Sequence, residues 1–378
     1  MKVVKEIKMV DLKTQYNRIK TEIDSAIHEV LESTQFIKGP GVKLFEDNLA
    51  AYLGTNHVIS CANGTDALQI AMMALQYQPG DEVITSSFTY VATAEVIALL
   101  KLTPVLVDVN PDTFTIDPLS IEKAITDKTR AIVPVHLFGQ CADMEPILEI
   151  AAKYNLDVIE DNAQAIGADY LFSNGERKKC GTLGTLGTTS FFPSKNLGCY
   201  GDGGALNTNN SILAERIRKI SNHGQSKQYI HDEIGVNSRL DSIQAAVLNI
   251  KLKYLDEYIE KRRLVANFYD KAFEGNRNLV IPHRASYSSH VFHQYTLQIR
   301  NINRDLVKEK LAQKGIPSMV YYPIPLHLQK AYKAPRYQEG MFPVSEKLCN
   351  SVLSIPIHTE LESDELKYIT ESLLKINE

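Results

Sequence analysis

Apolar residues recur along the chain with two periods, which predict alternating helices and strands. Near the N-terminus, apolar positions at helical spacing predict an amphipathic helix over residues 16–31. Beyond it, short apolar runs alternate with helical patterns at residues 66–76, 90–100 and 144–154. The runs predict strands at residues 57–61, 82–85, 103–109, 130–135, 157–160, 190–193 and 204–208. This order favours an α/β fold in which a mostly parallel central sheet carries helices on both faces.

The pattern changes in the last part of the chain. Long helical periodicity runs over residues 241–273, and the period then shifts. The segments that follow predict a small α+β domain: residues 291–300 and helices over residues 304–314 and 363–375. A chain of 378 residues can bury a large core. We therefore expect a large domain at residues 1–275 and a smaller C-terminal domain at residues 276–378.

One lysine lies between a short apolar strand and a glycine-rich turn. Lys195 follows the apolar run at residues 190–193 and precedes the turn at residues 198–204. A lysine forms an imine only as the neutral amine, so a catalytic lysine needs a pKa lowered by burial or by a nearby positive charge. The setting indicates Schiff-base chemistry. The motif alone leaves one alternative open, a solvated lysine in a glycine loop.

Two upstream segments fit a pyridoxal phosphate (PLP) cofactor. Asp161 ends a buried strand, where α/β sheets place their chemistry, and a carboxylate there can keep a pyridine nitrogen protonated. Gly64 and Thr65 open an apolar-periodic helix, whose first N–H groups and the Thr65 hydroxyl suit a phosphate. Ordinary helix capping is the alternative in both places, by Asp161 in one and by Asn63 or Thr65 in the other.

Composition and missing motifs argue against several other classes. Lys and Arg number 41 and Asp and Glu 45, so no basic excess points to nucleic acid or to an anionic membrane. No apolar run reaches the ~18 residues of a membrane span, and the first residues lack a signal-peptide core, which predicts a soluble, cytoplasmic protein. Five widely spaced cysteines predict reduced thiols. The histidines fit no metal-ligand spacing, and no Rossmann glycine motif or P-loop occurs.

Ordered motifs along nearly the whole chain resemble those of the DegT/DnrJ/EryC1/StrS family of PLP-dependent sugar aminotransferases. This family is a branch of the fold-type I aminotransferases. The resemblance implies a fold-type I PLP-dependent transferase that acts as a homodimer with shared active sites. Besides the segments around Asp161 and Lys195, the matching motifs are residues 37–40, 63–68, 79–84, 88–94, 134–140 and 235–241.

The resemblance also implies a role for each matched residue. Lys195 would form the imine with the cofactor and shuttle the proton, and pyridoxamine phosphate would be the intermediate form of the cofactor. Asp161 would pair with the pyridine nitrogen, and Gln164 with the phenolic oxygen. Phe88 would lie against the ring face. The residues implied for the phosphate are Gly64, Thr65, Ser190 and, from the other subunit, Asn237.

The choice of substrate depends on arginines and tyrosines. Amino-acid aminotransferases of this fold hold the α-carboxylate with a small-domain arginine, and past Arg304 this chain has only Arg336. This favours a nucleotide sugar as the amino acceptor, although carboxylate binding by Arg336 stays open. Within the family, the chain most resembles enzymes that aminate C3 of UDP-N-acetyl-3-oxo-glucuronate for bacterial surface polysaccharides, with L-glutamate as the expected donor. Tyr321 and Tyr322 would lie in the sugar pocket, with Tyr321 where those enzymes usually have histidine.

Arg239 lies two residues past Asn237 and has two possible roles. It would meet the uronate carboxylate, or it would form an ion pair that only shapes its loop. Three other functions stay open. One is C4 amination of a UDP- or dTDP-linked 4-oxo sugar. The others are a PLP-dependent sugar dehydratase, against which Lys195 argues, and a non-catalytic cofactor-binding regulatory protein.

Overall fold

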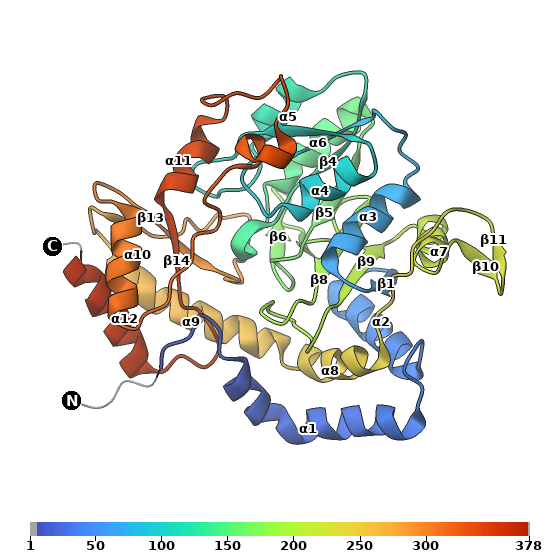
Figure 1. Cartoon of the computed structure of the whole chain (residues 1–378), viewed down its shortest axis with the longest axis horizontal. Coiled ribbons are helices and arrows are strands. Elements are labelled where there is room, and N and C mark those ends of the chain that lie inside the picture. The colour runs from blue at the N-terminus through green and yellow to red at the C-terminus, as the bar shows by residue number, and fades with distance from the viewer. Residues whose placement is uncertain (1–5, 377–378) are drawn as a thin grey trace.

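A seven-stranded sheet forms the centre of the computed structural model, which describes residues 6–376 (Figure 1). The strand order is β1-β9-β8-β5-β4-β2-β3. Neighbouring strands run parallel except at β9, which is antiparallel to both β8 and β1. The mostly parallel sheet is therefore confirmed. The strands are β1 His57–Cys61, β2 Glu82–Ser86, β3 Thr103–Val107, β4 Thr129–Val133, β5 Asp157–Asp161, β8 Leu186–Ser190 and β9 Gly204–Thr208.

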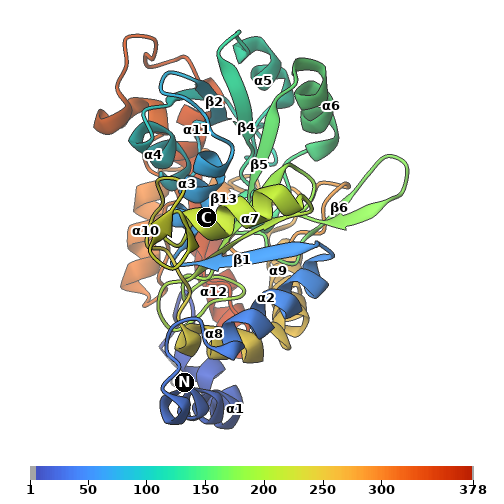
Figure 2. The ribbon, with the colours of Figure 1, turned by 90° about the vertical axis from the view of Figure 1, so that its right-hand side faces the viewer.

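Helices cover both faces of this sheet because adjacent strand residues point to opposite sides. Val58 and Ile132 join one hydrophobic cluster, with α2, α5, α6 and α8. Ile59 and Val133 join a second, with α3, α4 and α7. Figure 2 shows α7 on one side of β1 and α2 and α8 on the other. The helices are α2 Pro40–Leu53, α3 Gly64–Ala74, α4 Ala92–Leu99, α5 Pro118–Ala124, α6 Met144–Tyr154, α7 Ser211–Ile220 and α8 Ser242–Leu252.

The C-terminal elements build a further hydrophobic cluster, which confirms the predicted small α+β unit. The same cluster includes residues 265–273 at the end of α9 (Leu255–Phe273), whereas Leu255 and Ile259 pack in the cluster under the main sheet. A single helix thus contributes to both cores, and the domain boundary at residue 275 stays a prediction. The elements of this unit are β12 Leu279–Val280, β13 Tyr295–Ile299, α10 Arg304–Gln313, β14 Val352–Ile355 and α12 Ser363–Ile376. Helix α11 (Pro343–Ser351) packs instead in a cluster with Phe88 and Phe138.

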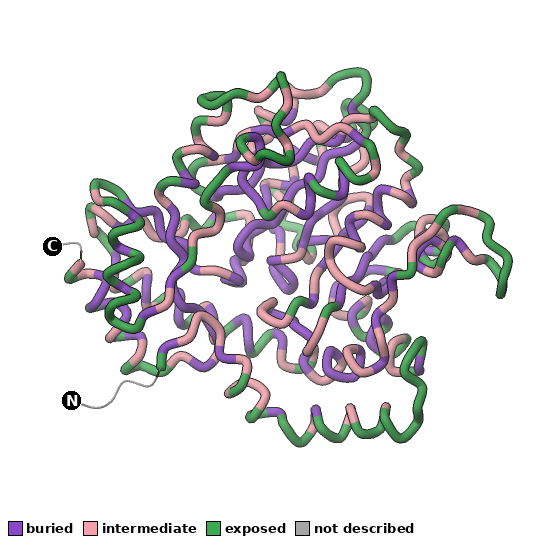
Figure 3. The backbone as a smooth tube through the Cα atoms, viewed as in Figure 1, coloured by how far each residue is buried: buried purple, intermediate pink, exposed green. Residues whose placement is uncertain are grey.

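One long helix and two hairpins lie outside these layers. The N-terminal helix α1 (Leu12–Ser33) packs Ile19 and Ile23 against α8, and its other faces are largely exposed (Figure 3). The hairpin of β10 (Gln225–Lys227) and β11 (Ile230–His231) projects from the body. β6 (Asp169–Leu171) and β7 (Arg177–Lys179) form another hairpin. None of the helices within residues 6–376 is long and apolar enough to cross a membrane.

One predicted strand is displaced in the structure. The strand expected at residues 190–193 lies earlier, at Leu186–Ser190, and Phe191 begins the loop that carries Lys195. The helical periodicity over residues 241–273 belongs to two helices, α8 and α9, with a break at residues 253–254. The apolar period continues across this break, so periodicity alone does not reveal it.

The prediction that all five cysteines are reduced thiols is wrong for one pair. Cys141 and Cys180 form a disulfide, with their Cα atoms 6.2 Å apart, although 39 residues separate them in sequence. Neighbouring His136 offers this pair no free ring nitrogen for a metal. Its Nδ1 accepts a hydrogen bond from the Ala142 N–H (3.1 Å), and its Nε2 lies 2.8 Å from Glu160. Cys61, Cys199 and Cys349 are free and buried.

Candidate active site

A cavity of ≈ 710 Å³ opens at the carboxyl ends of β5 and β8. Parallel strands present their carboxyl ends on one edge, so residues that end strands far apart in sequence meet there. Lining residues come from the main sheet, from the start of α3 and from the C-terminal unit. The sequence-predicted residues that line it are Gly64, Thr65, Asp161, Gln164, Ser190, Lys195, Tyr321 and Tyr322. Phe88, Asn237 and Arg239 are not among its lining residues.

Lys195 reaches this cavity from a loop that is tightly held. Its N–H donates to the Phe192 carbonyl (2.8 Å), and the next side chain, Asn196, donates through Nδ2 to the Val291 carbonyl (3.0 Å). Burial of the amine lowers the pKa of Lys195 to about 8, and the negative charge of Asp161 acts in the opposite direction. At pH 7 about one such amine in ten is therefore a neutral nucleophile.

Side chains of helix α8 bind the loop that follows Lys195. Lys251, which is 1% exposed, donates through Nζ to the Gly198 carbonyl (2.5 Å). Gln244 accepts from the Tyr200 N–H (2.8 Å) through Oε1. These contacts fix the backbone on the carboxyl side of Lys195. The support comes from side chains about fifty residues away in sequence, which no local motif reveals.

Asp161 presents a fixed carboxylate to the cavity. It is 6% exposed, accepts from the Thr93 hydroxyl (2.8 Å) and from the Ala163 N–H (3.2 Å), and is followed by turns rather than by a helix. The helix-cap alternative for Asp161 is therefore wrong. Glu160, one residue earlier, points the opposite way and accepts from three backbone N–H groups of the loop at residues 181–184. Asp161 thus faces the cavity, whereas Glu160 holds the loop at residues 181–184.

Gln164 has a defined amide orientation. Its Oε1 accepts from the Phe138 N–H (2.9 Å), and its Nε2 donates to the Tyr322 hydroxyl (3.3 Å). Burial raises the pKa of Tyr322, so this side chain stays a neutral phenol that can donate a hydrogen bond. The pair places an amide and a phenol on the cavity wall, where both can bind polar groups of a ligand.

The position of Phe88 does not support its predicted place against the cofactor ring. Phe88 is 1% exposed and makes edge contacts with Phe138 and Tyr322 in an aromatic cluster outside the cavity lining. Tyr90, two residues further on, lines the cavity and is 57% exposed. Its ring lies 6.2 Å from that of Tyr322. Tyr90 is thus the aromatic residue of this segment that a cofactor ring can reach.

The start of α3 forms an anion cradle at this cavity. Asn63 caps the helix by accepting from the Asp66 N–H (2.8 Å), so Gly64 and Thr65 keep their N–H groups for a ligand. A Cβ at Gly64 would lie 2.6 Å from Cβ of Ser190, so only glycine permits this close approach of helix and strand. A helix N-terminus, a fixed carboxylate and a lysine with a lowered pKa share one cavity. These groups fit PLP.

His293 is a cavity residue that sequence reasoning missed. It is 7% exposed, and its Nδ1 has no hydrogen-bond partner among the described residues. Burial, with the nearby positive charges of Lys195 and Arg262, holds the pKa of His293 well below its usual value, so the imidazole is neutral. His293 lies almost a hundred residues from Lys195, and nothing in its local pattern links the two. Sequence reasoning also did not single out Asp202, which lines the cavity, or Thr93, which donates to Asp161.

Comparison with known proteins identifies the family. The sequence profile of the DegT/DnrJ/EryC1/StrS aminotransferase family matches residues 17–374. The chain belongs to this family. It is 48% identical over 370 residues to the "Pleiotropic regulatory protein" of Geobacillus stearothermophilus, covering 97% of each chain. It is also 48% identical over 367 residues to the UDP-2-acetamido-2-deoxy-3-oxo-D-glucuronate aminotransferase of Pseudomonas aeruginosa, covering 97% of this chain and 99% of the other.

A solved structure supports the assignment of the fold. DesV of S. venezuelae, in complex with a ketimine intermediate, superposes with a TM-score of 0.94 at 39% identity and 99% coverage of both chains. The fold-type I assignment is confirmed. Aminotransferases of this family depend on PLP, so the chain is a PLP-dependent sugar-nucleotide aminotransferase.

Proposed function

We propose that the chain transfers an amino group from L-glutamate to C3 of UDP-N-acetyl-3-oxo-glucuronate, in the biosynthesis of a bacterial surface polysaccharide. Two observations support this proposal. Lys195, Asp161 and the anion cradle share one cavity, and the chain is 48% identical to an aminotransferase named for that uronate. We further propose that it works as a cytoplasmic homodimer with shared active sites.

The cavity residues divide the work of the reaction. When bound, PLP supplies the electron sink that makes proton loss from the amino-bearing carbon feasible. The neutral amine of Lys195 would take that proton and deliver it to the cofactor carbon on the other side of the transferred nitrogen. The Asp161 carboxylate holds a proton on the ring nitrogen. Gln164 and Tyr322 orient the cofactor through hydrogen bonds, and the start of α3 binds its phosphate.

The homodimer proposal follows from residues that lie outside the Lys195 cavity. Asn237 is exposed, and Arg239 lines a separate cavity of ≈ 290 Å³. Nearby apolar side chains are exposed, with Phe36 at 42%, Ile37 at 52% and Ile234 at 87%. A second copy of the chain that covers this surface would bury these apolar side chains. Asn237 and Arg239 of one protomer would then reach the Lys195 cavity of the other. Arg239 would then pair with the uronate carboxylate.

The test separates the two half-reactions on one variant. Arg239→Ala should leave the reaction with glutamate within about twofold of the native rate. It should weaken use of the 3-oxo uronate by about 30- to 1,000-fold, the scale of a truncated charge pair of 2–4 kcal/mol. The control is the matching 3-oxo sugar without a carboxylate, whose use should change little. Equal losses in both half-reactions would assign Arg239 to shaping its loop.

The name of the Geobacillus relative keeps a regulatory, non-catalytic role as the second candidate. Turnover of the purified protein with any amino donor and a nucleotide oxo sugar would exclude it. A panel of UDP-linked 3-oxo sugars and UDP- or dTDP-linked 4-oxo sugars identifies the carbon that is aminated. Preference for a 4-oxo sugar would replace the C3 assignment.

A further inference from the structure

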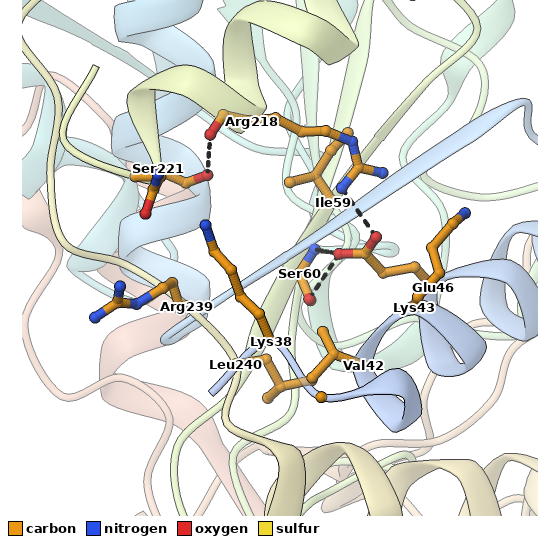
Figure 4. A pocket seen from close by; sticks show the side chains of 12 residues that line it. Lys38, Val42, Lys43, Glu46, Ile59, Ser60, Arg218, Ser221, Arg239 and Leu240 are labelled. Carbon is orange, nitrogen blue, oxygen red and sulfur yellow. Dashed lines mark hydrogen bonds and ion pairs between the residues drawn. The ribbon is translucent and has the colours of Figure 1, made fainter. Parts of the chain in front are cut away.

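The second cavity of ≈ 290 Å³ is rich in positive charge. It lies between the loop before α2, strand β1, the end of α7 and the segment before α8 (Figure 4). Glu46 is the one carboxylate among its lining residues. The cationic residues that line it are Lys38, Lys43, Arg218 and Arg239.

Two of these four cations already have partners. Arg218 pairs with Glu46 (3.0 Å), whose other oxygen accepts from the N–H and hydroxyl of Ser60. Lys43 pairs with Asp47. Within residues 6–376, the side chains of Lys38 and Arg239 have neither an ion pair nor a hydrogen bond, and in Figure 4 both ends lie free of the dashed contacts. Lys38 is exposed and Arg239 is half-buried, so both cations are available to an anionic ligand.

Hydrogen bonds connect the backbone segments that carry these two cations. Lys38 has φ +54°, a left-handed conformation that costs a non-glycine residue about 1–2 kcal/mol. Ser242 ties this loop to the segment after Arg239, because its hydroxyl accepts from the Gly39 N–H (3.2 Å) and its N–H donates to the Phe36 carbonyl (2.8 Å). A strained conformation that tertiary contacts maintain is typical of binding sites.

We propose that Lys38 binds the diphosphate of the nucleotide-linked sugar when this cavity of one protomer faces the Lys195 cavity of a second copy. This inference rests on the proposed function. In a nucleotide-linked uronate, C1 carries the diphosphate and C5 the carboxylate, and both carbons flank the ring oxygen. C3 lies across the ring. The substrate thus presents two anions at one end and its ketone at the other. The lysine is a point charge suited to a diphosphate, and the planar fork of Arg239 matches a carboxylate.

Calorimetric titration of the PLP-loaded enzyme with UDP tests the site without turnover. Lys38→Gln should weaken UDP binding about 10- to 100-fold, the scale of one charged hydrogen bond. Lys43→Gln is the matched control, because Lys43 lines the same cavity but is paired with Asp47, and it should change the affinity less than about twofold. UMP lacks one phosphate, so Lys38→Gln should weaken the binding of UMP much less than the binding of UDP. Native-like UDP binding by Lys38→Gln, equal losses in both variants, or no UDP binding by the native enzyme would each overturn the proposal.

Mixed dimers test whether Lys38 serves the partner's cavity. Differently tagged Lys195→Ala and Lys38→Gln protomers are combined, and heterodimers are assayed below the KM of the sugar substrate. If Lys38 acts across the interface, one of the two sites carries both substitutions and the other is intact. Heterodimer activity should then approach half of the native value and exceed that of either variant homodimer. Activity no higher than the mean of the two homodimers would overturn the cross-subunit role.

The two experiments separate this proposal from the proposed function. If Lys38 controls UDP binding but no 3-oxo uronate is aminated, the substrate assignment fails and the diphosphate site stands. If the uronate is aminated and Lys38→Gln has no effect on UDP binding, the diphosphate site fails and the proposed reaction stands.

Discussion

Asp161→Asn should change the pKa of Lys195 in a direction that the geometry determines. Burial lowers this pKa to about 8, while the negative carboxylate of Asp161 favours the ammonium form and opposes the lowering. Asparagine keeps the shape of the side chain but removes the charge. Its carbonyl oxygen can accept from the Ala163 N–H, and its amide NH2 can donate to the Thr93 hydroxyl oxygen. The pKa of Lys195 should therefore fall further in the variant.

The size of the effect follows from the fraction of neutral amine. With a pKa of about 8, about one amine in ten is neutral at pH 7, against about one in three thousand for a lysine with a pKa of 10.5. Loss of an opposite charge shifts a nearby pKa by about one unit or more. A fall of about one unit would leave about half of the Lys195 amines neutral at pH 7.

Competitive acetylation of the cofactor-free protein measures this pKa. Trace acetic anhydride is applied between about pH 6 and pH 11, a range that spans the pKa values of buried and free lysines. The Lys195 peptide is then quantified by mass spectrometry against N-acetyl-lysine as an internal standard. We expect a midpoint near pH 8 for the native protein and one about a unit lower for Asp161→Asn. A native midpoint that matches free lysine would refute the burial argument, and a higher midpoint in the variant would refute the sign of the charge effect.

Three further predictions concern the groups that build the site. Lys195→Ala should still bind PLP but lose single-turnover transamination of glutamate by about 10²- to 10⁴-fold or more, because no amine moves the proton; a near-native rate would exclude Lys195. Gly64→Ala should cost about 1–3 kcal/mol of stability and weaken PLP binding, since its Cβ would lie 2.6 Å from Cβ of Ser190. Its control, Gly41→Ala in α2, has nothing within 4 Å and should neither lower the melting temperature nor weaken PLP binding. Glu160→Gln should lower the free energy of unfolding in urea by about 2–4 kcal/mol, because an amide cannot accept from all three loop N–H groups; an unchanged midpoint would contradict this.

The site residues that the sequence located are those that follow a change of local pattern. Asp161 ends an apolar run, Gly64 and Thr65 open a helix, and Lys195 precedes a glycine turn. Each boundary lies at the carboxyl edge of the sheet, so the parallel topology brings them together. His293 shows no such boundary. It reaches the cavity only because the segment that carries it packs against residues 137–139.

The local sequence pattern also does not determine which of two neighbouring residues faces the cavity. Phe88 and Tyr90 are both aromatic and two residues apart, and which of them faces the cavity depends on how the turn between β2 and α4 is folded. The Cys141–Cys180 disulfide joins segments whose meeting depends on the whole fold. Likewise, the break between α8 and α9 interrupts no apolar period. Tertiary packing decides each of these features.

Mapping the lysine that binds the cofactor is the most direct test of the catalytic role of Lys195. The purified protein is loaded with PLP, treated with borohydride to fix the cofactor to the lysine that binds it, and digested for mass spectrometry. We expect a yellow protein that borohydride bleaches, with the cofactor on the peptide that contains Lys195. Buried Lys251, whose pKa burial also lowers to about 8, is the internal comparison and should carry none. Cofactor on Lys251, on another lysine or on none would contradict the account.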